Sequence, residues 1–140
     1  MSSESQWDVQ KSLYDVLRAD SQITSLLKDG QDSVFDYVPT KSERPYLVLG
    51  ESIAEPFETQ TETGLKMTVS LHIYSGYRGM REIKDIMRAV YDQLHHKSDF
   101  TITNQEVVMC RLVSSRVAVE DKGKTRHSVQ RFEIMTEPKI

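Results

Sequence analysis

The most restrictive feature of this sequence is the run LKMTVSLHIYS at positions 65–75. Apolar residues occupy every second position of the run, and they are Leu65, Met67, Val69, Leu71 and Ile73. Because successive side chains of a β-strand point to opposite faces, this pattern predicts a strand in a sheet with one buried face. A second layer of structure must cover that face.

Directly after this strand the pattern changes to the period of a helix. From about Met80 to His95, apolar residues recur at spacings of three and four, which predicts an amphipathic helix packed on the sheet. A second long helix is expected from about Ser5, where a serine can cap the first turn. A short helix is expected at 21–27, with Gly30 ending it in a left-handed conformation.

The other apolar runs predict further strands, at 33–39, 44–53, 106–120 and 125–135. The last two form a hairpin around Gly123, and we expect a break at Ser114-Ser115 and a bulge near Gln130. Residues 46–49 are nearly all apolar, so both faces of that strand are expected to be covered. The element order predicts an α+β fold, a mainly antiparallel β-sheet with two principal helices packed on one face. A length of 140 residues predicts one domain, 1–140.

The loop SGYRG at 75–79 resembles a ligand-binding loop in its glycines only. It lacks the lysine and hydroxyl residue of a phosphate loop and the spacing of a dinucleotide site. Gly76 to Gly79 does match the GXXG of a KH domain, but that loop joins two helices and this one follows a strand. A strand-to-helix turn is favoured, and a nucleic-acid-binding module that uses the Gly76–Gly79 loop stays open as the alternative.

No pattern of a catalytic nucleophile or a metal site is present. The GxSxG motif is absent, and the adjacent His95 and His96 do not form the i, i+4 pair that binds a metal. Cys110 is the only cysteine and lies in an apolar strand, which is typical of a core residue. We expect no enzyme activity, no cofactor and no metal. Acidic pairs such as Glu120-Asp121 are explained by solvation, although a dyad assembled by the fold is left open by spacing.

The net charge and the apolar content limit the kinds of partner that are expected. The net charge is −3, whereas dedicated nucleic-acid binders usually carry a basic field. No apolar run approaches the ~20 residues that span a bilayer, and the polar start MSSESQWDVQKS has no signal-peptide core. We therefore expect no membrane contact and synthesis in the cytoplasm.

The charge is unevenly distributed along the chain. Residues 29–64 carry eight acidic and two basic residues, whereas residues 105–135 carry six basic and four acidic residues. This separation allows attraction between neighbouring copies of the chain. A solvated surface with a local bias explains the same counts.

The segment 51–64 is expected to be a long polar connection with Pro56 inside it. Its acidic residues are accompanied by no basic residue and by the aromatic Phe57; they are Glu51, Glu55, Glu58 and Glu62. A flexible acidic hairpin with one exposed aromatic residue is suited to docking on a partner. A surface loop without a partner is the alternative.

The order of these segments resembles a known family. YVP, then RPYLVLG, then LHIYSGYRG before an amphipathic helix, then SSRV and TRHSVQRFEI resemble the tail completion (tail terminator, or tail-to-head joining) proteins of long-tailed bacteriophages and gene transfer agents. The similarity runs from about Leu13 to Pro138. Most of it rests on Tyr46, Gly50, Ser75, Gly79, Arg116, Gly123, Arg126, His127 and Phe132.

The resemblance implies a structural virion protein without enzyme activity. Such proteins form a hexameric ring that caps the tail tube, ends its polymerisation and joins the tail to the head connector. The implied partners are other copies of the chain, the tail tube protein, the connector or stopper protein, and DNA passing transiently through the lumen. The implied location is the head-proximal end of the tail, after assembly in the host cytoplasm. We expect the interface to use the acidic segment with Phe57, and Arg116 or Arg126 of a neighbour or of the tube.

Overall fold

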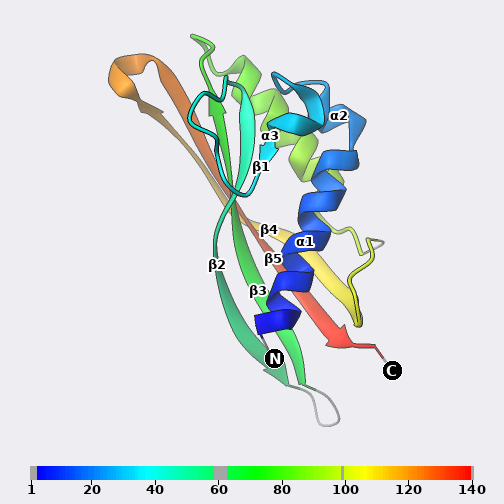
Figure 1. Ribbon diagram of the computed structural model, residues 1–140. Helices are drawn as coiled ribbons and strands as arrows, with labels where there is room; N and C mark the ends of the chain where they lie inside the picture. Colours follow the sequence, from blue (N-terminus) through cyan, green and yellow to red (C-terminus); the bar gives the residue numbers. More distant parts are fainter. Residues whose placement is uncertain (1–2, 59–62, 99, 140) are drawn as a thin grey trace.

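The computed structural model describes residues 3–58, 63–98 and 100–139 (Figure 1). Two long helices and four long strands make up most of the described chain. In chain order the elements are α1 (Ser3–Ala19), α2 (Ser21–Thr24), the 3-10 helix η1 (Gly30–Ser33), β1 (Val34–Phe35), β2 (Tyr46–Glu58), β3 (Thr63–Ser75), α3 (Arg81–Leu94), β4 (Gln105–Glu120), the 3-10 helix η2 (Asp121–Gly123) and β5 (Thr125–Pro138).

The strands form one five-stranded sheet in the order β1-β2-β3-β5-β4. The short β1 is parallel to β2, and every other neighbouring pair is antiparallel. Figure 1 shows the helices on one face of this twisted sheet. The predicted α+β class, with its mainly antiparallel sheet and its helices on one face, is confirmed.

The core lies between the sheet and the helices. All five apolar residues of the alternating run in β3 are buried, as the pattern predicted. The helices cover them with side chains that recur at helical spacing, and the fully buried ones among these are Val9, Leu13, Leu17, Ile83, Ile86, Val90 and Leu94. Met80, which the pattern placed on this buried stripe, is instead 41% exposed because it precedes α3. Burial of these aliphatic side chains is the main source of stability, at about 1.5–3 kcal/mol for each.

The predicted polar connection at 51–64 is wrong. β2 continues to Glu58 and β3 begins at Thr63, so the segment extends a β-hairpin and leaves only residues 59–62 outside the described structure. Cross-strand pairs run without interruption from Ser52 opposite Val69 to Glu58 opposite Thr63. Pro56 lies within β2, and a proline is tolerated there because no other strand pairs with that edge of the described β2. Residues 52–58 therefore form a strand with a defined register.

The predicted bulge near Gln130 is also wrong. β5 pairs with β3 without any shift of register, and the two irregularities lie in β4, between Val107 and Met109 and between Leu112 and Ser114. β4 nevertheless continues through Ser114 and Ser115, so the serines do not break it. Because β4 is the terminal strand of the described sheet, extra residues there disturb only one neighbour.

Smaller expectations have mixed outcomes. Gly30 and Gly123 both have positive φ, as predicted, although Gly30 begins η1 rather than ending α2. The strand expected at 33–39 is reduced to the two residues of β1. Burial alternates along residues 46–49, so only one face of this part of β2 is fully covered.

Candidate functional site

The sheet face opposite the helices carries a row of rings near one end. Tyr46 lies opposite Tyr74 and Tyr74 lies opposite His127, while Phe35 of β1 packs against Tyr46. The ring centroids are 5.7 Å apart for Phe35 and Tyr46, 5.2 Å for Tyr46 and Tyr74, and 4.3 Å for Tyr74 and His127. Aromatic contacts of this kind stabilise beyond their buried area. The row joins β1, β2, β3 and β5.

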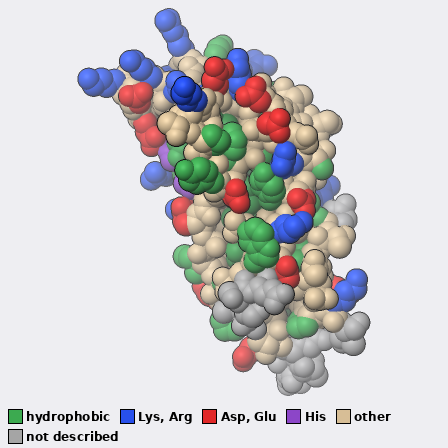
Figure 2. Space-filling view, viewed as in Figure 1, with side chains coloured by type: hydrophobic (Ala, Val, Ile, Leu, Met, Phe, Trp, Pro, Cys, Tyr) green, Lys and Arg blue, Asp and Glu red, His purple; other side chains and the backbone are tan. Residues whose placement is uncertain are grey.

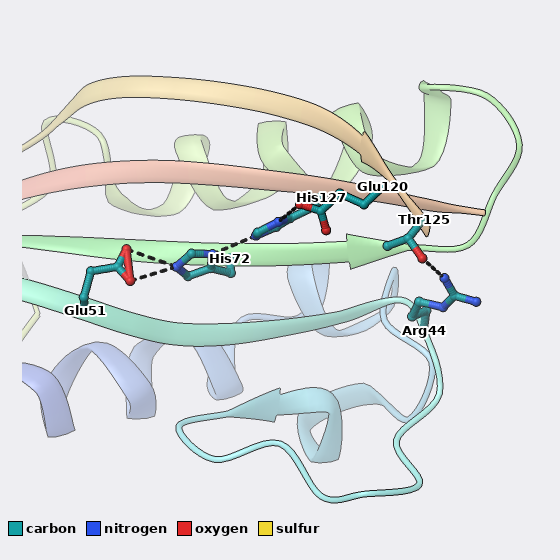
Figure 3. A network of polar contacts seen from close by, with 6 residues as sticks. All are labelled: Arg44, Glu51, His72, Glu120, Thr125 and His127. Carbon is teal, nitrogen blue, oxygen red and sulfur yellow. Dashed lines mark hydrogen bonds and ion pairs between the residues drawn. The ribbon is translucent and has the colours of Figure 1, made fainter. Parts of the chain in front are cut away.

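A chain of polar contacts crosses the same face (Figure 3). His72 Nδ1 lies 2.8 Å from His127 Nε2. The outer nitrogens of the two imidazoles face carboxylates: His72 Nε2 is 3.2 Å from Glu51 Oε1, and His127 Nδ1 is 2.9 Å from Glu120 Oε2. Because Glu51 lies on β2 and Glu120 on β4, this series of contacts spans the four strands β2, β3, β5 and β4. We name these four residues the histidine chain.

The surroundings of the histidine chain shift two pKa values. A hydrogen bond from its own backbone N–H lowers the pKa of Glu51, with a further contribution from the nearby His72. Burial raises the pKa of Tyr74, and the charges of Glu120 and Glu51 act in the same direction. The face thus favours an ionised carboxylate at one end and a neutral phenol beside the imidazoles.

A second ionic cluster lies further along this face. The carboxylate of Glu133 is buried, and its two oxygens face Arg111 Nε at 3.3 Å and Lys66 Nζ at 3.7 Å. Glu133 lies on β5, between β3 with Lys66 and β4 with Arg111. The charge of Glu133 is therefore compensated from both sides, as a buried carboxylate requires.

The glycine loop is a strand-to-helix turn, as favoured from the sequence. Ser75 Oγ donates to Glu82 Oε1 at 2.6 Å and accepts from the Tyr77 N–H at 3.1 Å, which ties the end of β3 to the first turn of α3. Arg44 packs against Gly76 and donates to the Lys124 carbonyl. It also donates to Thr125 Oγ1 at the start of β5 (Figure 3). The two-helix setting of a KH loop is not found here.

The acidic and the basic interface residues expected from the sequence lie on different strands of the sheet. Glu51, Glu55 and Glu58 lie on β2, and Phe57 is half-buried beside Gly64 rather than exposed. Glu62 lies outside the described residues. Arg116 is exposed on β4, at the opposite side of the sheet.

Arg126 is less available than expected from the sequence. It is half-buried and donates from Nη1 to the Gly123 carbonyl. This bond occupies part of its guanidinium within the β4–β5 turn.

The charged ends of the sheet are well separated. Glu58 is the last residue of β2, whereas the β4–β5 turn at the other end of the sheet carries the exposed Lys122 and Lys124 beside Glu120 and Asp121. Figure 2 shows Lys and Arg side chains gathered near that β4–β5 end.

Among the described residues, no group of three or more His, Cys, Asp or Glu side chains is arranged so that it could hold a metal ion, although four histidines occur in the sequence. Cys110 is buried, and burial raises its pKa to about 12, which suppresses the reactive thiolate at neutral pH. Among the described helices, none combines the length and the apolar character needed to cross a bilayer.

The histidine chain was missed by the sequence reasoning, which weighed the histidines only as metal ligands. A partial signal was available, because His72 and Tyr74 alternate with the apolar residues of β3 and must lie opposite the core. Partnership with His127 depends on the register between β3 and β5, which no local pattern encodes.

Comparisons with known proteins agree on one family. The sequence model of the family described as "Tail completion protein gp17" matches residues 11–137. The chain is 29% identical over 85 residues to "Tail completion protein gp17" of Bacillus phage SPP1, across 61% of this chain and 62% of that protein. The matched region thus spans about three fifths of the length of this relative.

The fold also matches a solved assembly. A chain of the structure titled "Virion of native gene transfer agent (GTA) particle" superposes with a TM-score of 0.85 and 21% identity, covering 97% of this chain and 99% of that chain. The fold and the family together define a structural protein of a phage-type tail. The chain belongs to the tail completion protein gp17 family.

Proposed function

We propose that this chain is a single-domain subunit of a hexameric ring that caps the tail tube, ends its polymerisation and joins the tail to the head connector. Family membership supports a role in completing a tail. The observation that carries the ring is the pair of open, differently charged sheet edges, β2 with its glutamates and β4 with Arg116. A closed ring needs two different, complementary patches on each subunit, and these edges supply them.

The proposed partners follow from this geometry. One end of the ring contacts the tail tube protein and the other contacts the connector or stopper protein, at the head-proximal end of the tail. DNA passes through the lumen during injection and needs only weak contact with the wall, which a chain with a net charge of −3 permits. The proposed role requires no chemistry, so we assign the chain no enzyme activity.

We propose that Glu55 and Glu58 on β2 meet Arg116 on β4 of the neighbouring copy. Glu55 and Glu58 are exposed, and neither has an ion pair with another described residue of its own chain. Arg116 is likewise exposed and without an ion pair among the described residues. Charges that are unsatisfied in the monomer and opposite in sign favour association between copies.

The ring is tested by light scattering on a sizing column at several protein concentrations. The expected species has six times the mass of 16.1 kDa, about 97 kDa. A double variant, Glu55→Lys with Glu58→Lys, should lose this species while its circular dichroism spectrum stays that of the folded subunit.

A matched control makes the same change of charge on the helix face. Asp85→Lys with Asp92→Lys lies on the exposed side of α3, where each carboxylate pairs only with an arginine of its own helix. This control should retain the ring. Normal assembly of the Glu55 and Glu58 variant would contradict the proposed interface.

A further inference from the structure

Besides the two-residue strand β1, two long stretches at the edges of the described sheet have no partner strand. β2 pairs with β1 only at Leu47 and Val48, so from Leu49 to Glu58 one edge of β2 faces no other strand of the described chain. β4 is the terminal strand on the other side, and its outer edge is partly occupied near Cys110. There the His96 N–H donates to the Cys110 carbonyl at 2.7 Å.

The occupied part of β4 ends close to its second irregularity. The Leu112 N–H donates to His95 Nδ1 at 3.0 Å, and the bulge residue Val113 follows. From Ser114 to Glu120 no described residue pairs with the outer edge of β4. Open edges of this length are templates for pairing with another strand.

The two edges run in opposite directions, because three successive antiparallel pairings separate β2 from β4. Two copies placed side by side, with their helices on the same side, therefore bring β2 of one copy beside β4 of the next as antiparallel neighbours. Repetition of this contact by rotation closes a ring. The alternative contacts of β2 with β2 or β4 with β4 are isologous and end at a dimer.

We propose that residues 52–57 of β2 pair with residues 114–119 of β4 in the next copy, with Glu55 opposite Arg116, so that one continuous sheet runs around the ring. The inference rests on the proposed ring and specifies how its subunits join. Glu55 and Arg116 both project from the sheet face opposite the helices, since they lie opposite Lys66 and Val129 respectively. Opposite charges in directly facing positions stabilise a strand pair.

The neighbouring positions match in the same register. Ile53, which is 65% exposed, lies opposite Ala118 on the face that carries Glu55. On the helix face, the half-buried Ala54 lies opposite the half-buried Val117. Pairing thus covers an exposed isoleucine and extends the apolar core from copy to copy.

Two features limit the pairing and make it selective. Pro56 has no N–H, so the edge of β2 lacks one donor and pairs poorly with an arbitrary strand. The register of β2 against β3 shifts between Leu49 and Ser52, which ends the regular edge at the same level as Val119 of the neighbour. The side-chain match around Glu55 must therefore supply the specificity.

The stagger between copies fits a barrel-like ring. Glu55 pairs with Lys66, which pairs with Met135. Met135 in turn pairs with Met109, so Glu55 and Met109 stand at the same level of one sheet. In the proposed pairing, Glu55 of the next copy faces Arg116, which lies seven residues beyond Met109, one of them the bulge residue. Each copy is therefore shifted along the strand direction by about six residues, or ~20 Å, relative to its neighbour. Each copy adds four strands, which amount to a width of ~19 Å across the sheet. A shift of this size over this width requires strands inclined by about 45° to the ring axis, close to the tilt in β-barrels.

Cysteine cross-linking tests the register. The full-length double variant Glu55→Cys with Arg116→Cys is oxidised with copper phenanthroline at high protein concentration and run on a non-reducing gel. The native Cys110 does not compete because it is buried. The expected result is a ladder of disulfide-linked species that ends at the closed ring, while each single variant stays monomeric on the gel. The control pair Glu55→Cys with Glu106→Cys places the second thiol at the far end of β4 and should give no ladder.

The outcomes separate this inference from the ring itself. A ladder from the Glu55 and Arg116 pair alone supports the continuous sheet. A species of about 97 kDa in light scattering without that ladder, or with a ladder from the Glu106 control, overturns the edge pairing and leaves the ring intact. A chain that remains monomeric and forms no ladder overturns both.

Discussion

His72 Nδ1 and His127 Nε2 are 2.8 Å apart, and the remaining nitrogen of each ring faces a carboxylate. A complete series of hydrogen bonds from Glu51 to Glu120 needs a proton on each outer nitrogen and one proton between the rings. With four protons on the two rings, two N–H groups would face each other. With two protons, one contact of the series would join two acceptors, either between the rings or between one ring and its carboxylate. The histidine chain is therefore complete when the two imidazoles share one extra proton.

This count predicts a loss of stability when His127 is replaced. His127→Gln should lower the free energy of unfolding by about 1–2 kcal/mol, because His72 and Glu120 each lose a partner and both rings are largely buried. Urea unfolding monitored by circular dichroism measures the change. His96→Asn is the control, because His96 is exposed and its positive φ suits asparagine. Equal stability of the His127 variant and the wild type would contradict the bonded chain.

Acidification should lower the free energy of unfolding through the protonation of Glu51. The pKa of Glu51 is lowered in the folded protein, so its contribution to stability is fully present above its ordinary value of 4.5 and is lost as the pH falls through the folded value. The side chain is 64% exposed, which keeps the effect below about 1 kcal/mol. Urea midpoints between pH 3 and 7 should show a shallower acid limb in Glu51→Gln. Parallel limbs in the variant and the wild type would be inconsistent with the shift.

Cys110 should be inert to thiol reagents in the folded chain. Burial raises its pKa to about 12, and the thiolate is the reactive form. At pH 8, Ellman's reagent should react only after unfolding in urea, whereas Glu106→Cys, an exposed position of β4 outside the proposed interface, should add one rapidly reacting thiol. Because the folded pKa is raised above the ordinary value of 9.0, stability should also fall as the pH rises above about 9. Rapid labelling of the native wild type would show that the strand opens locally.

The strongest periodic patterns predicted the fold well. The alternation in β3 and the helical spacing in α3 each depend on one buried face, and a single sequence records such a face directly. The α+β class follows from the order of these elements. The family resemblance added what periodicity does not contain, because a structural role in a tail leaves no catalytic residues to recognise.

The failures concern segments in which pairing overrides composition. Residues 51–58 are acidic and contain Pro56, yet they form a strand because β3 supplies partners from Ser52 to Glu58. The irregular apolar parity of β5 suggested a bulge, whereas Val129 is simply a buried residue on the face opposite the helices, between His72 and Arg116. The histidine chain depends on the register of four strands, so no local pattern announces it.

Gly64 should tolerate no side chain. A Cβ at this position would stand well inside the contact distance of the Thr136 carbonyl oxygen and 3.1 Å from the Phe57 ring. The carbonyl belongs to the backbone of β5 and cannot move aside without breaking the sheet. Gly64→Ala should therefore lower the free energy of unfolding by about 2–3 kcal/mol, the cost of overpacking a well-ordered site.

Gly79→Ala is the matched control, because its Cβ would meet only the Tyr77 ring at 3.6 Å, an ordinary contact. Urea unfolding of both variants measures the difference, and equal stability of the two would contradict the tight approach of β3 and β5 beside Phe57.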